Sequence, residues 1–200
     1  MAPISNSIRN AAPSVPSEAL EVPDDIELVR QIGRGDEAAF RVLVDREARY
    51  LYGIAHVLAG NAADAEDLVQ ETFAGALNSR FRGEASVRTW LVRILVRRAG
   101  LLRRSRRRQG RHRSLDTQAP DGPTSEITMS PGTAGAEARL DLATMLESLS
   151  PEHRTVIVLR ELRGLTYEEM ATALGVPQGT VESRLHRARE ELRRRFKGYL

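Results

Sequence analysis

The sequence contains no cysteine, and aromatic residues make up only 4% of it. Without cysteine, the chain can form no disulfide bond, no catalytic thiolate and no zinc site with cysteine ligands. Hydrophobic residues still make up 41% of the 200 residues, so a core is available, but it must consist mainly of aliphatic side chains. This length fits one domain, or two small domains with a linker.

Long apolar segments are missing as well. The sequence has no apolar run of about 18 residues, the length that a membrane-spanning helix requires. Residues 1–22 also lack the apolar stretch of a secretory signal peptide. We therefore expect a cytoplasmic protein with no membrane insertion.

Positive charge is almost entirely arginine, because Lys197 is the only lysine in the chain. A GC-rich genome would by itself explain this preference. The net charge of +3 hides an uneven distribution: residues 50–79 contain four acids and no cation, whereas residues 80–113 contain 13 arginines and one acid. Residues 184–197 add seven more cations. This pattern predicts one acidic face for a protein partner and two basic faces for phosphate groups.

Periodicity and capping residues predict an all-α protein of two small helical domains joined by a flexible linker. Residues 1–23, with four prolines, are expected to form a disordered tail. Residues 24–108 should fold as a helical bundle whose apolar positions include Leu77 and Leu101. Residues 109–137 are rich in proline and glycine and predict the linker, and residues 138–200 predict the second domain. The last helix of the bundle is expected over 86–108.

Residues 166–192 have the pattern of a helix-turn-helix motif. Thr166 and Glu169 predict a capping box at the start of one helix, and Gly175 predicts the left-handed residue that ends it. Val176 and Pro177 then begin a longer, arginine-rich helix. In such motifs the second helix enters the major groove of DNA. We therefore predict DNA binding, with a helical hairpin that has a solvated basic face as the alternative.

Two other classes of protein share parts of this pattern. A dimeric helix-turn-helix regulator would have the C-terminal motif, but it would not explain an acidic segment followed by an arginine-rich helix. An enzyme that acts on DNA needs a nucleophile with its base, or clustered carboxylates with a metal. No such constellation stands out in the sequence, and the four histidines lack ligand spacing. We therefore predict no enzymatic activity, no metal and no cofactor.

Four segments are more specific. They are Asp64–Phe73, Phe81–Gly83 with Thr89–Ile94, Leu165–Glu169, and Gly179–Arg189. In this order they resemble the sigma-70 family of bacterial transcription initiation factors, particularly its extracytoplasmic-function (ECF) group, over about residues 24–108 and 138–197. The resemblance implies a subunit that binds core RNA polymerase and directs it to promoters through −10 melting and −35 recognition.

The resemblance also implies roles for side chains of the first domain. The acidic helix would dock on the clamp helices of the largest polymerase subunit through Asp64, Asp67, Gln70 and Glu71. The −10 DNA would be contacted by Phe81, Arg82, Arg88, Arg93 and Arg97, with an extruded base held near the loop at residues 81–86. From the residues alone, a solvated acidic face is favoured over a docking surface, and Phe81 could equally belong to the core. Trp90 lies on the apolar stripe of its helix and is assigned mainly to the core.

In the second domain the resemblance implies −35 contacts. These would come from Thr180, Glu182, Ser183, Arg184, His186 and Arg187. Arg187 could bind guanine and Glu182 could accept from cytosine, while Arg184 is better placed for phosphate. Arg97 stands where the family commonly has asparagine, and Glu182 where many relatives have a cation, so both bear on promoter preference. The domain would also contact the polymerase flap, and factors of this group are often held by an anti-sigma factor.

Overall fold

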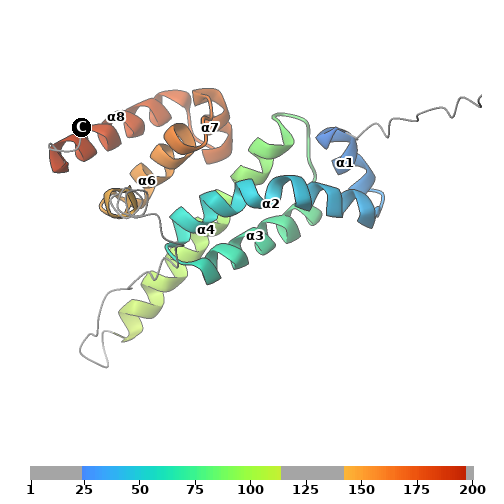
Figure 1. Cartoon of the computed structure of the whole chain (residues 1–200), viewed down its shortest axis with the longest axis horizontal. Coiled ribbons are helices and arrows are strands. Elements are labelled where there is room, and N and C mark those ends of the chain that lie inside the picture. The colour runs from blue at the N-terminus through green and yellow to red at the C-terminus, as the bar shows by residue number, and fades with distance from the viewer. Residues whose placement is uncertain (1–23, 114–141, 197–200) are drawn as a thin grey trace, which may run out of the picture.

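The computed structural model describes residues 24–113 and 142–196, and every regular element in these two ranges is a helix (Figure 1). The N-terminal bundle consists of α1 (Asp25–Ile32), α2 (Glu37–Ala59), α3 (Ala62–Leu77) and α4 (Val87–Arg113). The C-terminal domain consists of a short helix at residues 142–147, α6 (Pro151–Ile157), the π turn η1 (Val158–Leu162), α7 (Tyr167–Leu174) and α8 (Gln178–Arg195). The predicted all-α class is confirmed.

Local capping groups define most of the helix ends. The carboxylate of Asp24 accepts from the Glu27 amide at 2.7 Å, and that of Asp36 accepts from the Ala38 amide at 2.8 Å. The amide oxygen of Asn61 accepts from the Asp64 amide at 2.9 Å. Gly60, with φ of +83°, ends α2 in the left-handed conformation that glycine adopts without steric cost.

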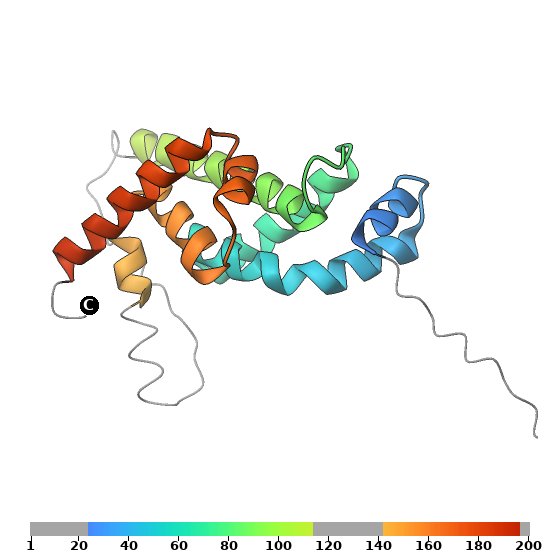
Figure 2. The ribbon, with the colours of Figure 1, turned by 90° about the horizontal axis from the view of Figure 1, so that it is seen from above.

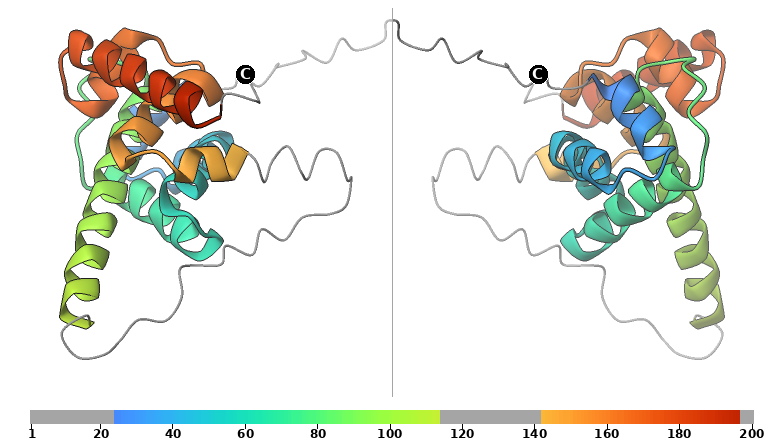
Figure 3. Two further views of the ribbon diagram at one scale, coloured as in Figure 1. Left: turned by 90° about the vertical axis from the view of Figure 1, so that its left-hand side faces the viewer. Right: turned by 90° about the vertical axis from the view of Figure 1, so that its right-hand side faces the viewer.

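The helix α4 differs from its expected extent, because it continues to Arg113 instead of ending at 108. Arginine is a good helix former, and no proline interrupts this stretch. The first five residues of the expected linker, 109–113, therefore belong to α4, whose end projects past the rest of the bundle (Figures 1 and 3). The predicted tail at 1–23, linker residues 114–137, the domain start at 138–141 and the C-terminal residues 197–200 lie outside the described residues.

Two apolar side chains expected in the core are exposed instead. Leu101 is 46% exposed, whereas the neighbouring Leu102 packs against the core, so Leu101 lies on the solvent side of α4. Leu77 is 54% exposed because it is the last residue of α3, where the helix reaches the surface. Helical spacing left the position of Leu101 at the edge of the apolar face undecided, and it gave no sign of where α3 reaches the surface.

The core of the N-terminal bundle is built around α2, which packs against α1, α3 and α4. Its fully buried side chains include Leu43, Leu51, Ile54, Leu91 and Leu95. Phe40 of α2 and Phe73 of α3 meet edge to face with ring centroids 6.1 Å apart. The core is therefore mainly aliphatic, as the composition requires.

In the C-terminal domain, α6 and α7 pack against α8 around Val156, Met170, Val181 and Leu185, all of which are buried. The capping box at Thr166 and Glu169 is present, with both of its hydrogen bonds formed.

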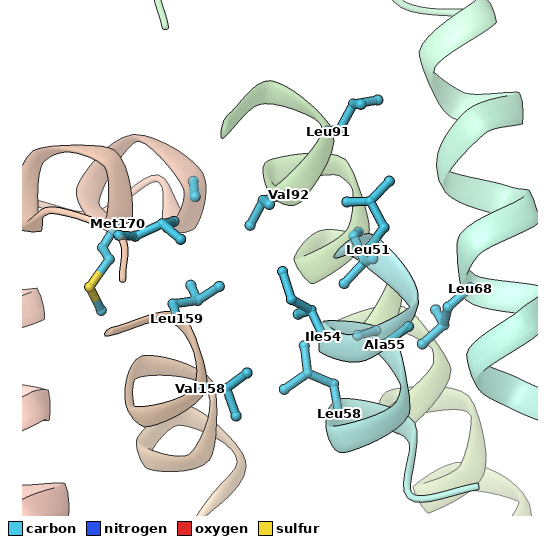
Figure 4. Packing of buried hydrophobic residues seen from close by; sticks show 14 of the residues in the cluster. Leu51, Ile54, Ala55, Leu58, Leu68, Leu91, Val92, Val158, Leu159 and Met170 are labelled. Carbon is cyan, nitrogen blue, oxygen red and sulfur yellow. The ribbon is translucent and has the colours of Figure 1, made fainter. Parts of the chain in front are cut away.

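The two domains also pack against each other. Helix α7 lies along α4, and α6 with η1 contacts α2 (Figure 2). Figure 4 shows Ile54 and Leu58 of α2 pointing toward Val158 and Leu159 of the C-terminal domain. All four side chains are buried, so the two cores are continuous. Within the described residues, no helix has both the length and the apolar character to cross a membrane.

Candidate nucleic-acid and protein-binding surfaces

The acidic side chains of α3 lie opposite its buried face. Ala65, Leu68 and Phe73 are buried against the bundle. Asp67, Gln70 and Glu71 are exposed on the other side, and Glu66 is exposed beside them. The predicted exposure of acidic side chains on this helix is thus found for Asp67 and Glu71. Carboxylates in this position can bind a basic partner.

Asp64 differs from the other predicted residues of this surface. Its side chain is only 19% exposed, and it forms an ion pair with Arg106 of α4. It also accepts a hydrogen bond of 2.5 Å from the side-chain amide of Asn61. The structure therefore commits Asp64 to joining α3 to α4. Glu71 is much less committed, since its contact with Arg98 is 3.5 Å long and both side chains are exposed.

A hollow of about 570 Å³ lies beside the loop between α3 and α4; we call it the loop hollow. Its walls come from α1, the start of α2, the end of α3 and the loop itself. Phe81 and Trp90 line it, with ring centroids 5.3 Å apart, and both are only partly buried. Four arginines also line the hollow: Arg30, Arg34, Arg80 and Arg82. Stacking rings and cations therefore surround one cavity.

The predicted −10 residues fall into three groups. Phe81 and Arg82 belong to the loop hollow. Arg93 and Arg97 are exposed on α4, four residues apart and therefore on one face. Arg88 is directed elsewhere, because its Nε and Nη2 donate to the two carboxylate oxygens of Glu47, each at 2.8 Å. This bidentate contact raises the pKa of Arg88.

Glu47 is a residue that the sequence analysis missed. It is 1% exposed in the middle of α2, where it joins that helix to α4 through Arg88. The signal was present, because Glu47 lies four residues after Leu43 and four before Leu51 in an apolar row. A carboxylate in such a row indicates a buried partner.

The predicted −35 residues lie on α8. Glu182, Ser183, His186 and Arg187 are exposed, and their spacing places them on one face of the helix. Val181, Leu185 and Ala188 are buried on the opposite face. Glu182 accepts from Gln178 at 2.9 Å, and the Ser183 hydroxyl donates to the Thr180 carbonyl at 3.0 Å.

Arg184 lies away from this exposed face. It is partly buried and contacts Glu152 of α6 at 3.2 Å, which ties α8 to the rest of its domain. Arg189 has a similar role, since it donates to Glu161 of η1 at 3.0 Å through its Nε, and this contact raises the pKa of Arg189. Gly175, with φ of +65°, makes the turn between α7 and α8 that presents the exposed face.

Two family models match the chain. The model described as Sigma-70 region 2 matches residues 43–111, and the model described as Sigma-70, region 4 matches residues 139–192. These ranges correspond to the N-terminal bundle with its acidic helix and to the C-terminal domain with its helix-turn-helix.

Several curated proteins are similar over most of the chain. The sigma-H factor of Pseudomonas aeruginosa is 31% identical, with 84% of this chain and 91% of that protein covered. The ECF sigma-E factor of Escherichia coli K12 is 34% identical, with coverage of 82% and 90%. The ECF sigma factor SigE of Mycolicibacterium smegmatis is 38% identical over 80% of this chain, which spans 63% of that protein.

Two solved structures have the same fold. CnrH in complex with the cytosolic domain of CnrY has a TM-score of 0.65 and 26% identity, covering 88% of this chain and 99% of that one. The sigma factor RpoE of Bartonella quintana, in complex with the anti-sigma factor NepR, has a TM-score of 0.62 and 26% identity, covering 80% and 98%. The chain therefore belongs to the ECF group of sigma-70 factors, which are not enzymes but subunits that bind core RNA polymerase and direct promoter-specific initiation of transcription.

Proposed function

We propose that this sigma factor divides polymerase binding and promoter recognition among three of its surfaces. The exposed acids of α3 bind core polymerase, the loop hollow with α4 holds the opened −10 DNA, and the exposed face of α8 reads the −35 element. The observation that carries the proposal is the loop hollow, where an aromatic pair and four arginines surround one cavity next to the arginine-rich helix.

The loop hollow has the chemistry that an unstacked base requires. A base leaving the duplex loses stacking, and an aromatic side chain can restore about 1–3 kcal/mol of it. Phe81 and Trp90 provide such rings, and Arg80 and Arg82 provide cations for the neighbouring phosphates. A volume of about 570 Å³ is of the size that accommodates small organic ligands, so one nucleotide fits.

For polymerase binding, we propose Asp67, Gln70 and Glu71 as the contact residues, with Glu66 beside them. We assign Asp64 a structural role, the joining of α3 to α4, because it is paired with Arg106 and partly buried. A basic helix pair on the polymerase would find exposed carboxylates on one face of α3, and such complementarity favours fast and specific association.

For the −35 element, His186 and Arg187 occupy the centre of the exposed face of α8 and Glu182 lies one turn earlier. Arg187 can donate two hydrogen bonds to a guanine, and Glu182 can accept from a cytosine amino group. Thr180 and Ser183 lie close to the start of α8, where contacts to DNA phosphates are common. Arg184, held by Glu152, then positions the helix and supplies charge.

The two solved relatives are each bound to a partner, the cytosolic domain of CnrY and the anti-sigma factor NepR. By this likeness an anti-sigma factor is a candidate partner of this chain. The flap region of polymerase is the partner we propose for the C-terminal domain. The cytoplasm, where core polymerase meets the chromosome, is the compartment we propose.

Transcription with purified core polymerase tests the polymerase contact. On a promoter library from the same genome, the protein should support specific initiation, and Asp67→Arg should abolish it by weakening the complex with core polymerase. Asp45→Arg on α2 is the matched control, because Asp45 is also an exposed acid inside a helix and should tolerate the change. Tight DNA binding without polymerase association would overturn the proposal.

Trp90 fluorescence tests the loop hollow, because Trp90 is the only tryptophan in the chain. Single-stranded DNA that carries the −10 element found in the library should change its emission on binding. Phe81→Ala should weaken this binding roughly tenfold, as the loss of one stacking contact requires. Val42→Ala, at another partly exposed apolar side chain, should not change it. Equal binding by both variants would contradict the assignment of the hollow.

A further inference from the structure

Arg163 follows directly after η1, and its side chain extends from the C-terminal domain onto α2. Its guanidinium carbon lies 5.2 Å from the ring centroid of Tyr50. The same group covers Gly53 so closely that a Cβ atom at position 53 would overlap Nη2 and lie 2.8 Å from Cζ. Gly53 and Tyr50 thus form a notch on α2 that the guanidinium of Arg163 fills.

The notch is held rigidly from the side of the bundle. Arg88 stacks on the Tyr50 ring with its guanidinium carbon 4.6 Å from the centroid, and buried Glu47 fixes Arg88 through two hydrogen bonds. Burial in this cluster raises the pKa of Tyr50, whose hydroxyl is protonated at neutral pH in any case. The ring therefore offers Arg163 a fixed, neutral surface to stack on.

The docking of Arg163 is closely balanced. Its Nε is buried and has no hydrogen-bond partner among the described residues, which is unfavourable. Stacking on Tyr50 and contact with Gly53 offset this loss. A small hollow of about 150 Å³ lies beside the contact and is lined by Arg88, Arg163 and Glu169, so the seal is incomplete.

The packed arrangement conflicts with simultaneous reading of two promoter elements. This conflict rests on the function proposed above, in which α4 contacts the −10 DNA and α8 reads the −35 element. In the structure α7 lies against α4, and α8 is only about 27 Å long. Elements centred near −10 and −35 lie roughly 25 base pairs apart, which is about 85 Å of DNA. Residues 114–141 join the domains, and a segment of that length can reach about 95 Å when extended.

We propose that Arg163, seated in the notch of Tyr50 and Gly53, is a latch that holds the C-terminal domain closed on the N-terminal bundle, and that it releases when the factor engages a promoter. The packing of α7 against α4, together with the apolar contact of Ile54 and Leu58 with Val158 and Leu159, forms the rest of the closed interface (Figure 4). The latch adds the part of the closed interface that depends on the side chain of Arg163 and on Gly53.

Gly53→Ala is a selective test of the latch. Alanine favours the helical state over glycine, so α2 itself should become more stable. The new Cβ nevertheless occupies the place of the guanidinium and forces Arg163 out of the notch. A change that strengthens the bundle should therefore open the two domains. Gly100→Ala in α4 is the matched control, because the nearest atom there lies at an ordinary 3.7 Å.

Domain separation can be measured directly, because the chain has no native cysteine. Spin labels on Asp45→Cys and Glu190→Cys, one exposed site in each domain, would give the distance distribution by pulsed electron spin resonance. The parent protein should show mainly one short distance. Gly53→Ala should raise the ratio of open to closed molecules about fivefold, the effect of losing one cation–π contact, whereas Gly100→Ala should not change it.

Arg163→Ala should open the protein to a similar extent, and it should add little when combined with Gly53→Ala. Distance distributions that match the parent in both single variants overturn the latch. The distance measurement needs neither polymerase nor DNA, so it is independent of the proposed function. If both variants open the protein but bind a promoter with polymerase no faster than the parent, the latch stands and its role in promoter engagement is overturned.

Discussion

Replacing Arg88 by alanine should leave the carboxylate of Glu47 inside the N-terminal bundle without its counter-charge. Glu47 is 1% exposed, and both of its oxygens accept hydrogen bonds of 2.8 Å from Arg88. The arginine side chain is 51% exposed, so only one member of the pair is desolvated. The cost of desolvation therefore falls almost entirely on Glu47, and the two members should respond differently to substitution.

The magnitude follows from this asymmetry. Removing one member of a fully buried ion pair costs about 3–5 kcal/mol, whereas exposed pairs contribute about 0–1 kcal/mol. Water can reach the position of Arg88, so we expect Arg88→Ala to lower the free energy of unfolding by about 2–3 kcal/mol. The double variant Glu47→Met/Arg88→Ala removes the buried charge as well, and it should be more stable than Arg88→Ala alone.

Urea unfolding followed by Trp90 fluorescence is the assay, because the single tryptophan lies in the N-terminal bundle and reports on that domain. Arg49→Ala, at another exposed arginine of the bundle, is the control and should change stability by less than about 0.5 kcal/mol. If the double variant is less stable than Arg88→Ala, Glu47 does not carry an uncompensated charge and the reasoning is wrong.

Three further substitutions test the C-terminal domain by thermal unfolding followed with circular dichroism. The pKa of Glu191 is lowered by His153 at 2.9 Å and by Arg195 at 2.6 Å. The ionised Glu191 therefore stabilises the fold fully above its unfolded-state pKa, and this stabilisation is lost as the pH falls through its folded-state pKa. Glu191→Gln should therefore lower the melting temperature at neutral pH and have no effect in acid; an equal loss at all pH values would contradict this. Thr166→Ala removes a capping box and should cost about 1 kcal/mol, against no change for Ser183→Ala. Gly175→Ala places a Cβ at φ of +65° and should cost about 1–2 kcal/mol and weaken −35 binding; unchanged binding would show that this turn does not set the angle of α8.

Helix ends and the helix-turn-helix were predictable because their signals are local. Asp36, Asn61 and Thr166 each cap a helix within three residues of their own position, and Gly175 needs only its own φ angle. The chain's resemblance to a known family supplied the order of the domains and their functions. The assignment of individual promoter and polymerase contacts stays a prediction.

Contacts between distant residues were not predictable in the same way. The pairing of Asp64 with Arg106 joins two helices across 42 positions of the chain, and the local capping by Asn61 does not reveal it. The exposure of Leu77 depends on where α3 reaches the surface, and that of Leu101 on which side of α4 the rest of the bundle covers. The fit of Arg163 into the notch depends on the packing of two domains, which no periodicity within either domain encodes.

The π turn at Val158–Leu162 sets the direction of the residue that follows it. A π turn holds one residue more than an α-helical turn, and one residue of an α-helix corresponds to a rotation of about 100°. If this turn relaxed to regular α-helix, Leu162 would move toward the direction that Arg163 now takes. A change of helical register alone would then replace a cation by an aliphatic side chain at the domain boundary. The strength of domain closure is therefore adjustable through backbone geometry, with the amino-acid sequence unchanged.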